Sequence, residues 1–264
     1  MRRDIELLHA GGRPGAWGNL GLWDAATPDY FGACQALASA VAKATGLKPG
    51  DRVLAVACGA GEELRLWQQD FGAAEVAGVE ADPASARRAR TLAPGARVLE
   101  GSGVTLLELG LPEGYFDRVL CVDAAYHLQP RQAFLQAARR LLRPGGTLAY
   151  TDLVSERAHP VLRGAARLCG LHEDALLPAQ AQQQRLLALG YTEVRIERLD
   201  EAVLGGFARF VRRQDIAPWH WPRVATTAAL IGPCRAAGLG YAMLSATASA
   251  ERTALSSSGT PGIA

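Results

Sequence analysis

Short apolar runs alternate with helical patterns through the middle of this sequence, and that alternation restricts the fold more than any other feature. Within each run apolar residues follow one another without regular polar interruption, which is typical of strands buried on both faces of a parallel sheet. The runs lie at 53–57, 75–79, 97–99, 118–122 and 147–151, and the helical patterns at 62–71, 83–92 and 130–142. We therefore predict an α/β fold, a mostly parallel sheet with helices packed against it.

The segments on either side of this region complete a predicted division of the chain into five parts. Residues 1–30 are rich in glycine and aromatic residues and are expected to form an N-terminal arm or lid. The core is expected at 31–200, with further helices at 31–45 and 179–189 and a half-exposed strand at 192–199. We expect a helical cap at 201–240, the last strand of the core at 241–255, and a disordered tail at 256–264.

Composition limits the kinds of partner that this chain can have. Its 264 residues are 49% hydrophobic and carry a formal net charge of +2, without the basic face that nucleic-acid binding needs. The five cysteines include no Cys-x-x-Cys pair, so neither a disulfide framework nor a metal site is expected. The N-terminus lacks a signal-peptide pattern, and no apolar run is long enough to cross a membrane. We expect a soluble cytoplasmic protein; its oligomeric state stays open.

The segment ACGAG at residues 57–61 joins the first apolar run to a helical pattern. Glycine in such a turn lets a ligand approach the backbone, and the following helix offers free N–H groups. A dinucleotide would need a third glycine where Leu64 stands, and its pyrophosphate would be repelled by Glu62 and Glu63. The two carboxylates suit the ammonium and sulfonium groups of S-adenosylmethionine (SAM). The residues therefore favour SAM.

Glu80 directly follows the second apolar run, roughly 20 residues after the turn, where an acid would accept hydrogen bonds from ribose hydroxyls. Four segments, in chain order, then resemble the motifs of class I SAM-dependent methyltransferases: VLAVACGAG, AGVEAD, YFDRVLCVDAAYHL and LLRPGG. The resemblance covers roughly residues 30–200, a common size for one domain. It is closest to the tocopherol, sterol and sugar O-methyltransferases, which also carry a glycine-aromatic segment like residues 19–23.

This resemblance implies a three-layer Rossmann-like sandwich whose seven-stranded, mostly parallel sheet has the order 3-2-1-4-5-7-6, with SAM at the carboxyl ends of the strands. The positions that it implies for cofactor binding are Ala57, Cys58, Gly59, Gly61, Glu80, Ala81, Ser102, Gly103, Asp123 and Ala124. Three positions depart from the family pattern. Ala55 replaces an acid that commonly helps to hold the SAM amino group, a role left to water or to Glu62. Ala57 replaces a glycine, and Ser102 an aspartate that faces the adenine amino group.

The segment DAAYH at residues 123–127 follows the fourth run, where the family places the transferred methyl group. Ala124 and Ala125 stand where enzymes that methylate base or glutamine nitrogens carry prolines, so that subclass is not expected. A hydroxyl acceptor must lose a proton, and His127 is the candidate base. An equal alternative is that His127 packs a turn or only orients the substrate. Oxygen, nitrogen and carbon acceptors all remain open.

Aromatic residues in the arm and the predicted cap suggest a hydrophobic or ring-containing acceptor. The predicted substrate-contacting residues are Trp23, Tyr126, His127, Trp219 and Trp221. The alternative for the cap residues is an aromatic cluster that only packs the insertion onto the sheet. Two alternatives remain for the function: a degenerate SAM-binding protein without catalysis and, less favoured, a nicotinamide-dependent oxidoreductase.

Overall fold

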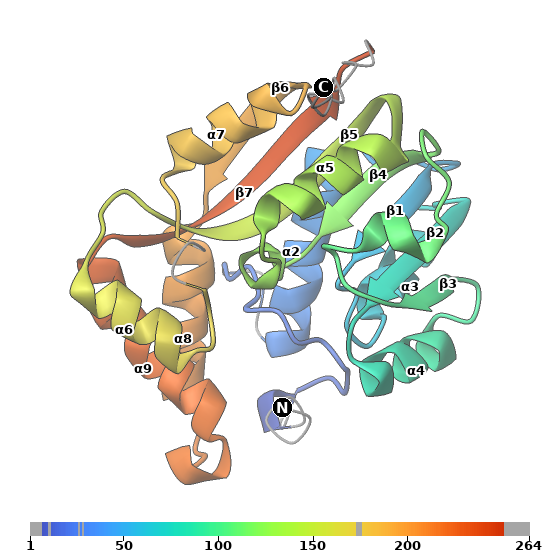
Figure 1. Cartoon of the computed structure of the whole chain (residues 1–264). Helices are drawn as coiled ribbons and strands as arrows, with labels where there is room; N and C mark the ends of the chain where they lie inside the picture. The colour runs from blue at the N-terminus through green and yellow to red at the C-terminus, as the bar shows by residue number, and fades with distance from the viewer. Residues whose placement is uncertain (1–6, 10–11, 26, 28, 173–175, 251–264) are drawn as a thin grey trace, which may run out of the picture.

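A single sheet forms the centre of the computed structural model, which describes residues 7–9, 12–25, 27, 29–172 and 176–250 (Figure 1). The tail predicted at 256–264 lies outside these residues. Seven strands are described: β1 (Arg52–Val56), β2 (Glu75–Glu80), β3 (Arg97–Glu100), β4 (Phe116–Cys121), β5 (Leu142–Ser155), β6 (Tyr191–Arg198) and β7 (Leu239–Ala248). Their order is β3-β2-β1-β4-β5-β7-β6, and the predicted topology is confirmed.

Pairing directions follow from the connections. The strands from β3 to β5 pair in parallel because each connection returns over a face of the sheet. Only β7 runs the other way among the described strands, antiparallel to both β5 and β6. The sheet is therefore mostly parallel, as predicted.

Helices cover both faces of the sheet, which gives the predicted three layers. One face packs against α2 (Tyr30–Ala44), α3 (Glu62–Gln69) and α4 (Pro83–Leu92). The other packs against α5 (Arg131–Leu141), α7 (Ala179–Ala188) and the 3₁₀ turn η1 (Leu106–Leu109). Successive residues of β1 separate accordingly: Val53 and Ala55 join the first core, Leu54 and Val56 the second. All four are fully buried, which explains why this run shows no polar alternation.

The start predicted for the fifth strand, at residue 147, is wrong. β5 begins at Leu142, which pairs with Phe116, and the next pair of the register is Arg118 with Thr147. The four residues from 143 to 146, which contain the Pro-Gly-Gly sequence, form an irregularity in this register. Gly145 has a positive φ of 73°, a conformation that glycine adopts without steric cost.

A group of helices lies beyond the carboxyl end of β5, apart from those that cover the sheet (Figure 1). Within the interval 201–240, the chain forms the π-helical turn η4 (Glu201–Gly205), α8 (Gly206–Arg212), the 3₁₀ turn η5 (Pro218–His220) and α9 (Pro222–Ala236). A further helix, α6 (Pro160–Leu168), packs against α9. No element is predicted from the sequence at α6, which has His159 as its N-cap and Pro160 as its first residue.

None of the helices described in the structure is both long and apolar enough to cross a membrane.

Candidate functional site

The turn between β1 and α3 has the backbone that its glycines predict. Gly59 and Gly61 have φ angles of 54° and 92°, and Ala57 has the same left-handed sign at 60°. A Cβ on Gly61 would lie 2.8 Å from Cα of Ala89, so this glycine permits close packing of α3 on α4. A Cβ on Gly59 would meet no atom within 4 Å. Gly61 therefore serves packing, whereas Gly59 faces open space beside the helix N-terminus.

Glu80 lies at the end of β2, beside this turn, and its carboxylate is oriented by the backbone. One oxygen accepts the Gly59 N–H at 2.9 Å, and the other accepts the Asp82 N–H at 2.9 Å. Each carboxylate oxygen retains further lone-pair capacity, because an ionised carboxylate has about four acceptor sites. The predicted ribose acceptor is thus already held in position next to the glycine turn.

The loop after β3 is the third part of this edge. Ser102 Oγ accepts the Val104 N–H at 3.3 Å. Gly103 is buried, and a Cβ there would lie 2.7 Å from side-chain atoms of Val56 and Leu128. This glycine brings the loop close to the end of β1. Ala81, by contrast, is exposed.

Asp123 directly follows the carboxyl end of β4 and organises a hydrogen-bonded cluster there. Its Oδ1 accepts hydrogen bonds from the hydroxyls of Tyr126 at 2.9 Å and Tyr241 at 2.7 Å. Its Oδ2 accepts the Leu20 N–H of the N-terminal arm at 2.7 Å. Burial raises the pKa of Asp123 to about 6, although these donors oppose the shift.

Thr151 of β5 links this cluster to the sheet. Its Oγ1 accepts the Asp123 N–H at 2.7 Å and lies 2.8 Å from the Tyr241 hydroxyl oxygen. Asp123 has a positive φ of 53°, which is uncommon for a residue other than glycine. These contacts on its backbone and side chain hold it in that conformation. Ala124 follows it as the half-buried residue before the next turn.

His127 ends the short 3₁₀ turn η2 (Ala125–His127) that follows the Asp123 cluster. Its ring centroid lies 4.6 Å from that of Tyr126. The residue is exposed overall, yet enough of the protein surrounds the ring to lower its pKa below 6.5 by desolvation. The imidazole is therefore largely neutral near pH 7 and able to accept a proton.

The N-terminal arm lies against both ends of this site. The Ala16 N–H donates to Glu62 at 2.9 Å, and Leu20 is held by Asp123. Farther along, the backbone N–H of Trp23 donates to the Ala202 carbonyl in η4 at 2.9 Å, and the Trp23 ring stacks on Phe210 of α8 with centroids 4.7 Å apart. The arm thus connects the glycine turn, the Asp123 cluster and the helices of the 201–240 interval.

The two tryptophans predicted to contact substrate lie in unlike surroundings. Trp221, at the N-terminus of α9, is 1% exposed and belongs to the core that includes Val224 and Phe207. Trp219, two residues earlier, is 76% exposed. Of the pair, Trp219 alone has a surface that a substrate can reach without local rearrangement.

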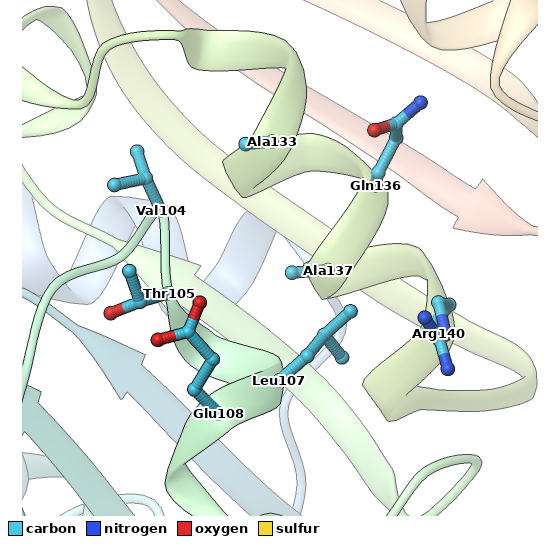
Figure 2. A pocket seen from close by; sticks show the side chains of 8 residues that line it. All are labelled: Val104, Thr105, Leu107, Glu108, Ala133, Gln136, Ala137 and Arg140. Carbon is cyan, nitrogen blue, oxygen red and sulfur yellow. The ribbon is translucent and has the colours of Figure 1, made fainter.

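Figure 2 shows a surface cavity of about 260 Å³ in another part of the fold. It lies between the η1 segment and α5, and its walls are Val104, Thr105, Leu107, Glu108, Ala133, Gln136, Ala137 and Arg140. None of the residues predicted for the site belongs to this lining. Its walls come from the η1 segment and α5 and include no strand residue, so it is not a candidate for the site at the strand ends.

Sequence reasoning missed several residues that complete the site. Tyr241 and Thr151 are distant in sequence from Asp123. The patterns of their strands indicate that they are buried but not which residues they hydrogen-bond. The arm residue Leu20 takes part through its backbone N–H, which leaves no side-chain signal. The sequence shows Glu62 and Glu63 as two adjacent glutamates. It does not show that their carboxylates have different hydrogen-bond partners.

The chain is similar to known methyltransferases. A family model described as a methyltransferase domain matches residues 54–150. Erythromycin 3''-O-methyltransferase from Saccharopolyspora erythraea is 28% identical over 209 residues, which cover 74% of this chain and 68% of that protein. The 27-O-demethylrifamycin SV methyltransferase of Amycolatopsis mediterranei is 29% identical over 174 residues, covering 60% of this chain and 64% of the relative.

A solved structure extends the likeness in fold. The [4+2]-cyclase SpnF matches with a TM-score of 0.70 and 24% identity, over 94% of each chain. The shared fold therefore includes nearly all of this chain, the helices beyond β5 among it.

Proposed function

We propose that this chain is a SAM-dependent methyltransferase of the class I fold, and that it methylates a hydroxyl group of a small hydrophobic or ring-containing acceptor. Two relatives support this proposal by their names, which are erythromycin 3''-O-methyltransferase and 27-O-demethylrifamycin SV methyltransferase. The observation that carries the proposal is the position of His127, in the turn η2 that follows β4, with its ring against Tyr126 of the Asp123 cluster.

The residues at the strand ends fit SAM. Open space at Gly59 accommodates a ligand against the backbone, and the adjacent Glu80 carboxylate is oriented to accept hydrogen bonds from a ribose. Ser102 and Gly103 in the loop after β3 are proposed to face the adenine, and Asp123 and Ala124 to border the reacting end. SAM supplies a methyl carbon that its sulfonium activates toward nucleophiles.

The chain itself would align the acceptor and remove its proton. We propose that His127 accepts the hydroxyl proton, while Tyr126, whose ring packs against it, fixes the imidazole. Asp123 acts as a positioning residue, because both of its oxygens already accept hydrogen bonds from protein donors. Trp23 of the arm and the exposed Trp219 are proposed to contact the acceptor and to exclude water. Trp221 is proposed to support them from within the core.

A matched pair of glycine variants separates the cofactor role of the turn from its packing role. Gly59→Ala should cost only about 1 kcal/mol of folding free energy, from the left-handed φ, but lower SAM affinity roughly tenfold or more. Gly61→Ala carries the same strain plus a clash with Ala89, so its loss should be about 2–4 kcal/mol. Urea unfolding and calorimetric titration with SAM measure both. Equal affinity of Gly59→Ala and wild type would show that the cofactor does not approach Gly59.

The second cofactor prediction concerns Glu80. Glu80→Ala removes an acceptor for two ribose hydroxyls, each charged hydrogen bond contributing about 1.5–3 kcal/mol. SAM and S-adenosylhomocysteine should lose affinity together, since they share the ribose. The control is Glu75→Ala, at the opposite end of β2, which should leave both affinities unchanged. Unaltered binding by Glu80→Ala would remove the ribose assignment.

A non-methylating protein remains the second candidate, because the fold is also that of a protein titled a [4+2]-cyclase. Incubation of the full chain with SAM labelled in its methyl group and a panel of hydroxylated ring compounds tests the activity directly. Label should move to an acceptor oxygen. Cofactor binding without labelled product across hydroxyl, amine and carbon acceptors would favour the non-methylating alternative.

We further propose a cytoplasmic location and no nucleic-acid partner. All five cysteines are free thiols, which is the ordinary state in a reducing compartment. The near-neutral net charge of +2 gives no electrostatic basis for binding a polyanion.

A further inference from the structure

Glu63, in the first turn of α3, is a buried carboxylate with an unsatisfied acceptor. The residue is 7% exposed, and its Oε1 has no hydrogen-bond partner among the described residues. Among the described residues, no ion pair includes Glu63. Leaving such an oxygen without a partner is costly, so a native structure retains one mainly where something else satisfies it.

Its neighbour Glu62 is occupied, although the two residues have the same side chain. Glu62 accepts the Ala16 N–H at 2.9 Å with one oxygen and pairs with Arg65 at 3.0 Å with the other. Glu62 therefore fastens the N-terminal arm to α3. This leaves Glu63 as the carboxylate of this turn that is available to a ligand.

Glu63 is the second residue of α3, which begins directly after the glycine turn at the carboxyl end of β1. Beyond burial, its charge raises the pKa of the Cys58 thiol in the glycine turn and of the Cys121 thiol at the end of β4. Burial and then the charge of Glu80, at the end of β2, raise the pKa of Glu63 itself. These effects agree with the position of Glu63 in the first turn of α3, on the edge of the sheet where the cofactor is expected.

We propose that Glu63 accepts a hydrogen bond from the α-ammonium group of SAM and so fixes the methionine part of the cofactor. The inference rests on the proposed cofactor site. Ala55 of β1 cannot supply a charge there, because it carries only a methyl group and is fully buried. A bound ammonium would satisfy the unpartnered oxygen and offset the repulsion between Glu63 and Glu80.

The test compares Glu63→Gln with Glu62→Gln in the full chain by calorimetric titration. The ligands are SAM, S-adenosylhomocysteine and methylthioadenosine, which lacks the amino-acid part. Glu63→Gln should weaken SAM and S-adenosylhomocysteine by roughly 10- to 100-fold and leave methylthioadenosine unchanged. The melting temperature should stay the same or rise, because glutamine has the same shape and removes a buried charge.

Proton release gives a second, independent measurement. Burial raises the free-state pKa of Glu63, so ammonium binding should expel a proton below that pKa, and SAM affinity should increase with pH until it is reached. Titrations in two buffers of different ionisation enthalpy should detect this proton, and it should disappear in Glu63→Gln.

The outcomes separate failure of the inference from failure of the cofactor site. If Glu63→Gln weakened the affinity for SAM but not for S-adenosylhomocysteine, Glu63 would interact with the sulfonium. If Glu62→Gln lost more affinity than Glu63→Gln, Glu62 would bind the ammonium. Each result overturns the proposal. Unchanged affinities in Glu63→Gln would overturn it too, while the SAM site stands. Absence of SAM binding by the wild-type protein would refute the site itself.

Discussion

Replacing His127 with alanine should lower the rate of methyl transfer to a hydroxyl acceptor by roughly 10²–10⁴-fold while SAM affinity changes little. The loss is that of a general base, since the hydroxyl proton would otherwise have no acceptor at the end of β4. Single-turnover rates at saturating SAM measure the chemical step. His159→Asn is the control, because it removes an exposed imidazole and keeps an acceptor for the N-terminus of α6. Near-full activity in His127→Ala would refute the base assignment.

The pH profile decides between His127 and Asp123. Desolvation lowers the pKa of His127, so the wild-type rate should rise with pH up to that lowered pKa and then become constant. Burial raises the pKa of Asp123 to about 6, so the aspartate also titrates on the acidic side of neutrality. If the histidine is the base, the rising limb should vanish in His127→Ala. A limb that persists there and disappears in Asp123→Asn would assign the proton to the aspartate.

The largest expected loss of stability comes from Arg131, in the first turn of α5. Its side chain is 1% exposed and pairs with the fully buried carboxylate of Asp152 at 2.5 Å. A cation at a helix N-terminus is unfavourable for the helix dipole, so the ion pair has to outweigh that repulsion. Arg131→Met would leave Asp152 buried without its partner and should cost about 3–5 kcal/mol in urea unfolding.

Two variants complete this measurement. Arg140→Met lies in the same helix, where Arg140 forms an exposed pair with Glu113, and should change stability by less than about 1 kcal/mol. The double variant Arg131→Met, Asp152→Leu removes both charges and should recover most of the loss. A single variant as stable as wild type would show that the buried pair contributes nothing net.

Arg131 also connects the fold to the site. Its Nε donates to the Ala125 carbonyl at 3.3 Å, within the turn that carries His127. The double variant should therefore regain stability without regaining the full rate, because no donor holds that turn. A rate equal to wild type would limit Arg131 to a structural role.

The local pattern of the sequence determined the elements and their order. The run at 53–57 predicted β1 because a strand whose two faces are both covered by helices is apolar throughout. The glycine turn predicted the start of α3, and Gly61 is its left-handed N-cap. Pro83 marked the first residue of α4, which Asp82 caps. Such signals are properties of a few consecutive residues, so they can be interpreted without knowing the tertiary contacts.

Only the tertiary structure decided which residues meet. Tyr241 reaches Asp123 across 118 positions because β7 pairs antiparallel with β5, in a register that sets Tyr241 opposite Leu153. The tertiary structure likewise buries Trp221 and leaves Trp219 exposed. It also hydrogen-bonds the N-terminal arm to Glu62 and not, among the described residues, to Glu63. The periodicity of apolar residues indicates which residues are buried, but not which remote residues they contact. Those partners depend on how insertions and strand order bring remote segments together.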